Sequence, residues 1–228
     1  MRRQAEQDRT ELKQAAARRA LELVRPGMVL GVGSGTTARY FTEGLAGLRV
    51  AAVPTSRESA ELARAAGVEL LDDPSGPLDL AVDGADEVDP ELRLVKGHGG
   101  ALFREKMVAL AARRFVVIVD DAKLVDRLGR TYVPVEVAPF LWRETAERLG
   151  GLGASWTLRG GEAEPYRTDN GNLIVDLRFA DGIEDPAATA SAIKAVTGVL
   201  EHGIVLGLVS GVIVAGGTGI RELGRVEE

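Results

Sequence analysis

Short apolar runs alternate with helix-forming segments through the first 130 residues, and this alternation constrains the fold more than any other feature of the sequence. The helical patterns lie at residues 38–45, 56–67 and 101–114. The apolar runs occupy residues 28–33, 49–55, 68–71, 78–83 and 115–120. Because these runs are continuously apolar, they predict strands that are buried on both sides. Such strands, alternating with helices, indicate a mostly parallel α/β sheet that is covered on both faces, known as a doubly wound sheet.

The pattern changes after Gly129, where the order becomes strand, helix, two strands, helix, strand. These elements are predicted at residues 131–138, 139–152, 154–159, 173–179, 186–198 and 199–206. Asn170-Gly171 offers a hairpin turn between the two central strands. The βαββαβ order is typical of a ferredoxin-like α+β domain. We therefore predict a Rossmann-like domain of residues 1–130 plus 206–228, and an inserted ferredoxin-like domain of residues 131–205.

Composition excludes several classes of function. The chain of 228 residues has no cysteine, so it has neither a disulfide framework nor a zinc–thiolate site. Its net charge of -6 with scattered basic residues argues against a nucleic-acid partner. It has no apolar run of the ~18 residues that a membrane span needs, and its charged N-terminus lacks a signal-peptide core. We expect a cytoplasmic protein that self-associates as a homo-oligomer, most simply a dimer.

A glycine-rich loop follows the first predicted strand. In open α/β sheets, ligands bind outside the carboxyl ends of the strands, and the run Ser34–Thr37 (SGTT) lies at such an end. Gly33 to Ala38 formally match a dinucleotide fingerprint, but the next strand ends without a ribose-binding acid and the Walker lysine is missing. The loop therefore suits a single phosphate on a small molecule. A tight strand–helix turn without a ligand is the alternative.

A second glycine-rich loop, Lys96–Gly100 (KGHGG), precedes a predicted helix that carries Glu105. The backbone amides of such a loop can stabilise an oxyanion or an enediolate. Glu105 shares one helix face with small apolar residues, namely Ala101, Val108, Ala109 and Ala112. A carboxylate on a packing face has a raised proton affinity, and this favours a general base near neutral pH. A salt bridge from Glu105 to an arginine is an equally open interpretation.

The run AVDGADEV places Asp83, Asp86 and Glu87 where a buried strand ends. A metal site would need more converging ligands, but the chain has two histidines and no calcium-binding loop. Lys96 on the next strand-end loop instead favours a set of groups that transfer protons. The alternative is that Asp83 and Asp86 only turn the chain. We expect no metal here, and we expect Glu87 to be a turn or helix-end charge.

These segments, in this order, resemble ribose-5-phosphate isomerase of type A. The residues that carry the resemblance are GVGSGTTA, VPTS, VDGADE, LVKGHGGALFREK, DDAK, VPVEV and TDNGN. The resemblance implies a cofactor-free interconversion of D-ribose 5-phosphate and D-ribulose 5-phosphate in the non-oxidative pentose phosphate pathway. It also implies that Glu105 moves a proton between C2 and C1 through a cis-enediolate. Asp83, with Asp86 and Lys96, would assist ring opening and move protons between O1 and O2.

The same resemblance implies the residues that bind the sugar phosphate. They are Ser34, Gly35, Thr36, Thr37, Asp83, Gly84, Ala85, Asp86, Lys96, Gly97, His98, Gly99 and Lys123. We expect the phosphate near the SGTT loop and Lys123. The sequence departs from the family pattern at His98, where glycine is usual, and we expect this side chain to point to solvent. Phe103 and Ala122 also depart from it, and we expect these three changes to bear on fine specificity and not on the reaction, because none removes a proposed catalytic residue.

Two other kinds of function compete with the isomerase. One is an amino-sugar-phosphate deaminase or a phosphogluconolactone hydrolase, which would favour a catalytic histidine near the carboxylates, with His98 as its candidate. The other is a sugar-phosphate sensor without catalysis, which would keep the phosphate loop but would not need Glu105. The presence of both Glu105 and Lys96 argues against the sensor.

Overall fold

A computed structural model describes residues 2–227, with side chains from residue 8 onward, so the two ends of the predicted first domain, residues 1 and 228, lie outside the described residues. The chain forms two compact units. The first consists of Met1–Ala85, Arg104–Leu124 and Leu208–Glu228, and the second of Asp86–Phe103 and Val125–Gly207. The contacts thus group residues 86–103 with the second unit. The domain boundaries drawn from the sequence stay a prediction.

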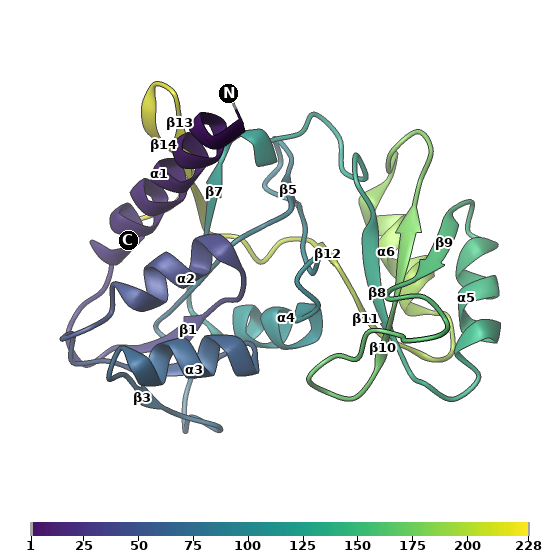
Figure 1. Cartoon of the computed structure of the whole chain (residues 1–228), viewed down its shortest axis with the longest axis horizontal. Helices are drawn as coiled ribbons and strands as arrows, with labels where there is room; N and C mark the ends of the chain where they lie inside the picture. The colour runs from purple at the N-terminus through teal and green to yellow at the C-terminus, as the bar shows by residue number, and fades with distance from the viewer. Residues whose placement is uncertain (1, 228) are drawn as a thin grey trace. The chain divides into compact units, whose positions relative to one another are not determined.

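The first unit contains a seven-stranded sheet in the order β14-β13-β7-β4-β1-β2-β3. Figure 1 labels its strands β1, β3, β7, β13 and β14. Its strands are β1 (Val29–Val32), β2 (Ala51–Pro54), β3 (Glu69–Leu70), β4 (Leu80–Asp83), β7 (Phe115–Asp120), β13 (Gly211–Gly216) and β14 (Gly219–Gly224). All neighbouring pairs are parallel except β13 and β14. The predicted doubly wound sheet is confirmed, and the C-terminal segment assigned to this domain adds β13 beside β7. The strand β14 was not predicted.

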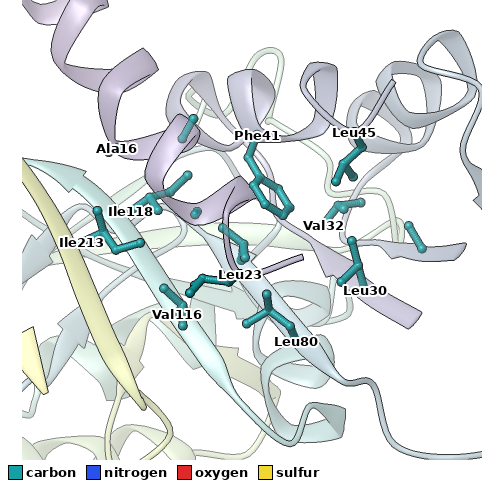
Figure 2. Packing of buried hydrophobic residues seen from close by; sticks show 14 of the residues in the cluster. Ala16, Leu23, Leu30, Val32, Phe41, Leu45, Leu80, Val116, Ile118 and Ile213 are labelled. Carbon is teal, nitrogen blue, oxygen red and sulfur yellow. The ribbon is translucent and has the colours of Figure 1, made fainter. Parts of the chain in front are cut away.

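Helices pack on both faces of this sheet. They are α1 (Arg2–Leu21), α2 (Thr36–Glu43), α3 (Arg57–Ala65) and α4 (Leu102–Ala111). On one face, α1 and α2 bury Ala16 and Phe41 against alternate strand residues such as Leu30 and Ile118 (Figure 2). On the other face, α4 approaches β1 closely: a Cβ on Gly31 would lie 2.3 Å from Cγ1 of Val108. Glycine at position 31 therefore permits α4 to lie against the sheet.

The second unit contains a four-stranded antiparallel sheet in the order β11-β8-β10-β9. Its elements are β8 (Val133–Val137), α5 (Trp142–Gly150), β9 (Ser155–Leu158), β10 (Leu173–Arg178), α6 (Pro186–Lys194) and β11 (Val199–His202). The order βαββαβ is the predicted ferredoxin-like arrangement, and it is confirmed. Val135 and Val175 pack with Leu149 and Ile193 of the helices in one buried cluster.

A small antiparallel sheet in the second unit was not predicted. It joins β12 (Ile204–Val205), β6 (Leu94–Val95) and β5 (Glu87–Val88). Strands of two residues give no detectable hydrophobic period, which explains the omission. The single strand expected at residues 199–206 is wrong, because it breaks at Gly203 into β11 and β12 of different sheets. The Gly203 carbonyl accepts a hydrogen bond from the Lys96 amide at 2.8 Å.

Candidate active site

In the first unit, Asp83 ties the first glycine-rich loop to the end of β4. Its Oδ1 accepts hydrogen bonds from the Ser34 amide at 3.2 Å and the Gly84 amide at 2.7 Å. Asp83 is only 3% exposed. A Cβ on Gly33 would lie 2.0 Å from Oδ1 of Asp83, so glycine is required for this approach. Two of the segments predicted from the sequence, SGTT and DGA, therefore meet at the carboxyl ends of neighbouring strands.

A cluster of hydroxyl groups supports the same loop. The Ser34 hydroxyl lies 2.7 Å from both the Thr55 and the Ser56 hydroxyl oxygens at the end of β2. Helix α2 begins at Thr36, directly after Gly35, whose φ of 90° lies in the left-handed region. The N-terminus of this helix favours an anion.

Lys13 was missed by the sequence analysis. Its Nζ reaches from α1 to the hydroxyl of Thr36 at 2.8 Å. A lysine at this distance places a positive charge at the start of α2, beside the predicted phosphate loop. No motif could have indicated it, because Lys13 and Thr36 are brought together by the packing of two helices.

Glu105 lies one turn into α4 and is 5% exposed. Val108 and Ala109 on the same helix are also buried. The expectation that Glu105 lies on a packing face is confirmed. Lys123 ends the short 3-10 helix η1 (Asp121–Lys123), which follows β7, and it is partly exposed. In the parallel sheet, β7 neighbours β4, so Lys123, which follows β7, and Asp83, which ends β4, lie at the same edge of the sheet.

In the second unit, Asp86 contacts the loop at residues 97–100. Its Oδ2 accepts a hydrogen bond from the His98 amide at 3.0 Å, and its Oδ1 lies 3.4 Å from Nδ1 of His98. The His98 ring stacks on Tyr132 with the centroids 4.0 Å apart, and its Nε2 lies 3.0 Å from the Tyr132 carbonyl oxygen. The expectation that His98 points to solvent is therefore wrong. Lys96 in the same loop is 4% exposed.

Two long side chains from the segment after β9 hold this loop. Arg159 donates to the carbonyl oxygens of Gly97 and His98, at 3.2 and 3.0 Å. The Tyr166 hydroxyl donates to the Gly99 carbonyl oxygen at 3.3 Å. Neither residue was predicted from the sequence, because both lie more than 60 positions further along the chain in a segment without a recognisable motif.

Glu87 is fully buried and lies in the strand β5, so the expectation of a turn or helix-end charge is wrong. Its Oε2 accepts from the amides of Gly129 and Arg130, at 2.7 and 3.3 Å. Its Oε1 accepts from the amide and the hydroxyl of Thr131, both at 2.6 Å. A buried carboxylate is tolerated when several donors satisfy it, and here they come from one tight segment. Glu87 therefore fixes the segment that leads into Tyr132.

Among the described side chains, those of residues 8–227, no group of three or more histidine or acidic residues gathers in a way that could hold a metal ion. Among the described helices, none combines the length and the apolar character needed to cross a bilayer.

The strand-end position of the hydroxyl cluster and Asp83 follows the rule for ligand sites in open parallel sheets. Together with the buried Glu105, it defines the chain as an α/β enzyme that acts on a small molecule. Comparison with known families agrees and is more specific. Residues 51–219 match the model of the family described as ribose 5-phosphate isomerase A (phosphoriboisomerase A), and the chain belongs to this family. The resemblance seen in the sequence motifs is confirmed.

Individual relatives cover nearly the whole chain. A ribose-5-phosphate isomerase A from Thermomicrobium roseum is 50% identical over 222 residues, covering 93% of this chain and 93% of the relative. A probable ribose-5-phosphate isomerase 2 from Arabidopsis thaliana is 44% identical, covering 92% of this chain and 85% of the relative.

Solved structures agree. The ribose 5-phosphate isomerase A of Methanocaldococcus jannaschii has a TM-score of 0.89 at 37% identity, covering 94% of this chain and 99% of that one. A D-ribose-5-phosphate isomerase in complex with phospho-erythronic acid has a TM-score of 0.89 at 39% identity, covering 94% of this chain and 98% of that one.

Proposed function

We propose that this chain interconverts D-ribose 5-phosphate and D-ribulose 5-phosphate, as an aldose–ketose isomerase of the pentose phosphate pathway, with Glu105 as the base. The observation that carries the proposal is the burial of Glu105, at 5% exposure, on the helix that follows the KGHGG loop. A carboxylate removed from water binds a proton more readily than an exposed one. This property suits a group that takes the C2 proton of the open-chain aldose and returns it to C1.

The remaining roles follow from the charge that develops during the reaction. When the C2 proton leaves, its bonding electrons form the C1=C2 double bond of a cis-enediolate, and negative charge moves to oxygen. Lys96 and the amides of the 97–99 loop would stabilise that charge. Asp83 and Asp86 would assist ring opening and carry the proton between O1 and O2. Oxidation at C2 balances reduction at C1, so the reaction needs no external oxidant.

The phosphate is assigned to the loop of Ser34, Gly35, Thr36 and Thr37. The start of α2 and the hydroxyl groups of this loop support the assignment. Lys13, at 2.8 Å from the Thr36 hydroxyl, and the predicted Lys123 would supply positive charge. The other predicted contacts, Gly84, Ala85, Gly97, His98 and Gly99, belong to the strand-end segments that would face the sugar.

The test is an isomerase assay on wild type and Glu105→Gln. Purified protein should convert ribose 5-phosphate to ribulose 5-phosphate without added metal and in EDTA. Glu105→Gln should lower kcat by about 100-fold or more, because the general base is lost. Glu61→Gln, on the exposed face of α3, is the matched control and should retain wild-type kcat. Near-normal turnover of Glu105→Gln would remove Glu105 from its role.

The proposal also includes a cytoplasmic location and assembly as a homodimer. The exposed apolar side chains Phe140 and Leu141, at 82% and 61% exposure, support self-association. Light scattering of the purified protein would contradict the dimer if it gave the mass of a single chain.

A further inference from the structure

We propose that Arg159 is a positioning residue for the isomerase. It orients two peptide units of the KGHGG loop so that the amides of His98 and Gly99 point away from it, and one of them holds Asp86. The inference rests on the proposed function, because it takes Asp86 and this loop to contact the substrate.

Arg159 makes contacts that only a guanidinium group can combine. It follows β9, and its Nε and Nη2 donate to the two carboxylate oxygens of Asp176, at 3.0 and 2.5 Å. Its Nη1 donates to the carbonyl oxygens of Gly97 and His98, at 3.2 and 3.0 Å. The planar fork of arginine suits such paired acceptors, whereas lysine presents a single point charge. The Arg159 side chain is 14% exposed, so these bonds are largely shielded from water.

Two tyrosines restrict the guanidinium further. Cζ of Arg159 lies 5.6 Å from the ring centroid of Tyr132 and 5.8 Å from that of Tyr166, both within the range of cation–π attraction. The Tyr166 hydroxyl also holds the next carbonyl oxygen of the loop, that of Gly99. Burial raises the pKa of both phenols above the ordinary value of 10.0, so they stay neutral at physiological pH.

The geometry of a trans peptide then fixes the amides. Its C=O and N–H point in opposite directions, and the described chain has no cis peptide. The carbonyl oxygen of the 97–98 peptide faces Arg159, while the N–H of the same peptide donates to Oδ2 of Asp86 at 3.0 Å. Arg159 and Asp86 therefore hold one peptide from opposite sides.

The next peptide follows the same rule. The His98 carbonyl oxygen faces Arg159, so the Gly99 N–H points away from the guanidinium. The Gly99 amide is thus directed to the side opposite Arg159, as a donor fixed in advance of the reaction, while the His98 amide holds Asp86. Without Arg159, the Gly97 carbonyl oxygen keeps the Gly100 amide at 2.9 Å, whereas the His98 carbonyl oxygen loses its guanidinium donor. Both peptides are then less restricted, and so is the Asp86 carboxylate that the His98 amide holds.

The experiment compares kcat and KM of Arg159→Ala, Arg159→Lys and the control Arg178→Ala, which removes an exposed arginine from the neighbouring strand β10. Arg159→Ala should lower kcat by about 100-fold, the effect of misplacing a catalytic group by about 1 Å. Added guanidinium ion should restore part of kcat to Arg159→Ala and none to Arg178→Ala. Arg159→Lys keeps the positive charge and serves as the second variant if Arg159→Ala does not fold. Its kcat should fall between those of Arg159→Ala and wild type.

The combination with Asp86→Asn separates this inference from the proposed function. If Arg159 acts through Asp86, the double variant should turn over about as slowly as the slower single variant. Additive losses, wild-type kcat in Arg159→Ala, or no rescue by guanidinium would overturn the positioning role while Asp86→Asn remains slow. Wild-type kcat in Asp86→Asn would instead overturn the proposed role of Asp86.

Discussion

The two glycine-rich loops each follow a strand and precede a helix, but they are stabilised in different ways. The SGTT loop is held by short side chains at the ends of adjacent strands, with Asp83 accepting from Ser34 across a gap that only Gly33 leaves open. The KGHGG loop is held by long side chains of the segment that follows β9, chiefly Arg159 and Tyr166. The SGTT loop therefore depends on the absence of a side chain at Gly33. The KGHGG loop depends on hydrogen bonds from residues that are distant in the sequence.

Among the variants that test this difference, Glu87→Gln should cause the largest loss of stability. It weakens the contacts that hold residues 129–131, and these lead into Tyr132 beside the KGHGG loop. A glutamine amide would turn one NH2 group toward backbone N–H donors, and the lost charge-assisted hydrogen bonds should cost about 3 kcal/mol of unfolding free energy. Both tryptophans, Trp142 and Trp156, belong to the second unit, so their fluorescence during urea unfolding reports on it.

Glu91→Gln is the control for this measurement, because the Glu91 side chain is 70% exposed in the same segment. It should leave the unfolding midpoint unchanged. Equal midpoints for Glu87→Gln and wild type would show that the donors of residues 129–131 do not need the charge.

A somewhat smaller effect is expected for Gly33→Ala, which fills the space that the first loop requires. The new Cβ would lie 2.0 Å from Oδ1 of Asp83, so the loop or the carboxylate must move, at a cost of about 1–3 kcal/mol. Hydrogen exchange of the β1 and β4 amides measures the loss. The tryptophan fluorescence transition should change less than these amides do.

Gly76→Ala is the control for overpacking, because a Cβ there meets no atom within 4 Å. Slower isomerase turnover in Gly33→Ala, with Gly76→Ala normal, would support the role of Asp83. Unchanged exchange in Gly33→Ala would show that the first loop tolerates a side chain and does not depend on free space.

The smallest effect should come from Tyr166→Phe, which removes one hydroxyl anchor of the second loop but keeps the ring. The hydrogen bond to Gly99 is long, at 3.3 Å, and Tyr166 is 38% exposed. We expect a loss below about 1 kcal/mol and less than a fivefold change in kcat. A tenfold or larger loss in steady-state kcat would mean that Tyr166, and not Arg159, is the principal anchor.

The main sheet of each unit could be predicted from the sequence, because each unit has a distinct order of apolar runs and helical segments. Continuously apolar runs separated by helices predicted the parallel sheet, and the βαββαβ order predicted the antiparallel one. The apolar stripe around Glu105 predicted its burial for the same reason, since neighbours at three and four positions share a helix face. Strands β5 and β6 escaped prediction because two residues cannot express a period.

The hydrogen bonds that hold the candidate site in place could not be predicted, because the residues that they join are distant in the sequence. Glu87 stands among acids at a strand end, yet its donors lie more than 40 positions later. Lys13 reaches Thr36 through helix packing, and Arg159 reaches Gly97 across 62 positions. A motif is a pattern of residues that are close in the sequence, so it can indicate candidate ligand-binding residues. It cannot indicate contacts between segments that meet only when the chain folds.

The position of β13 between β7 and β14 has a consequence for synthesis of the protein on the ribosome. Val116 pairs with Gly211, so nearly a hundred further residues must be synthesised before one edge of β7 can pair with β13. Until then a fully buried, apolar strand exposes unpaired backbone groups to other nascent chains. Because long-range pairing of this kind is slow to form, the first unit should complete its folding late, after residues 125–207 have left the exit tunnel.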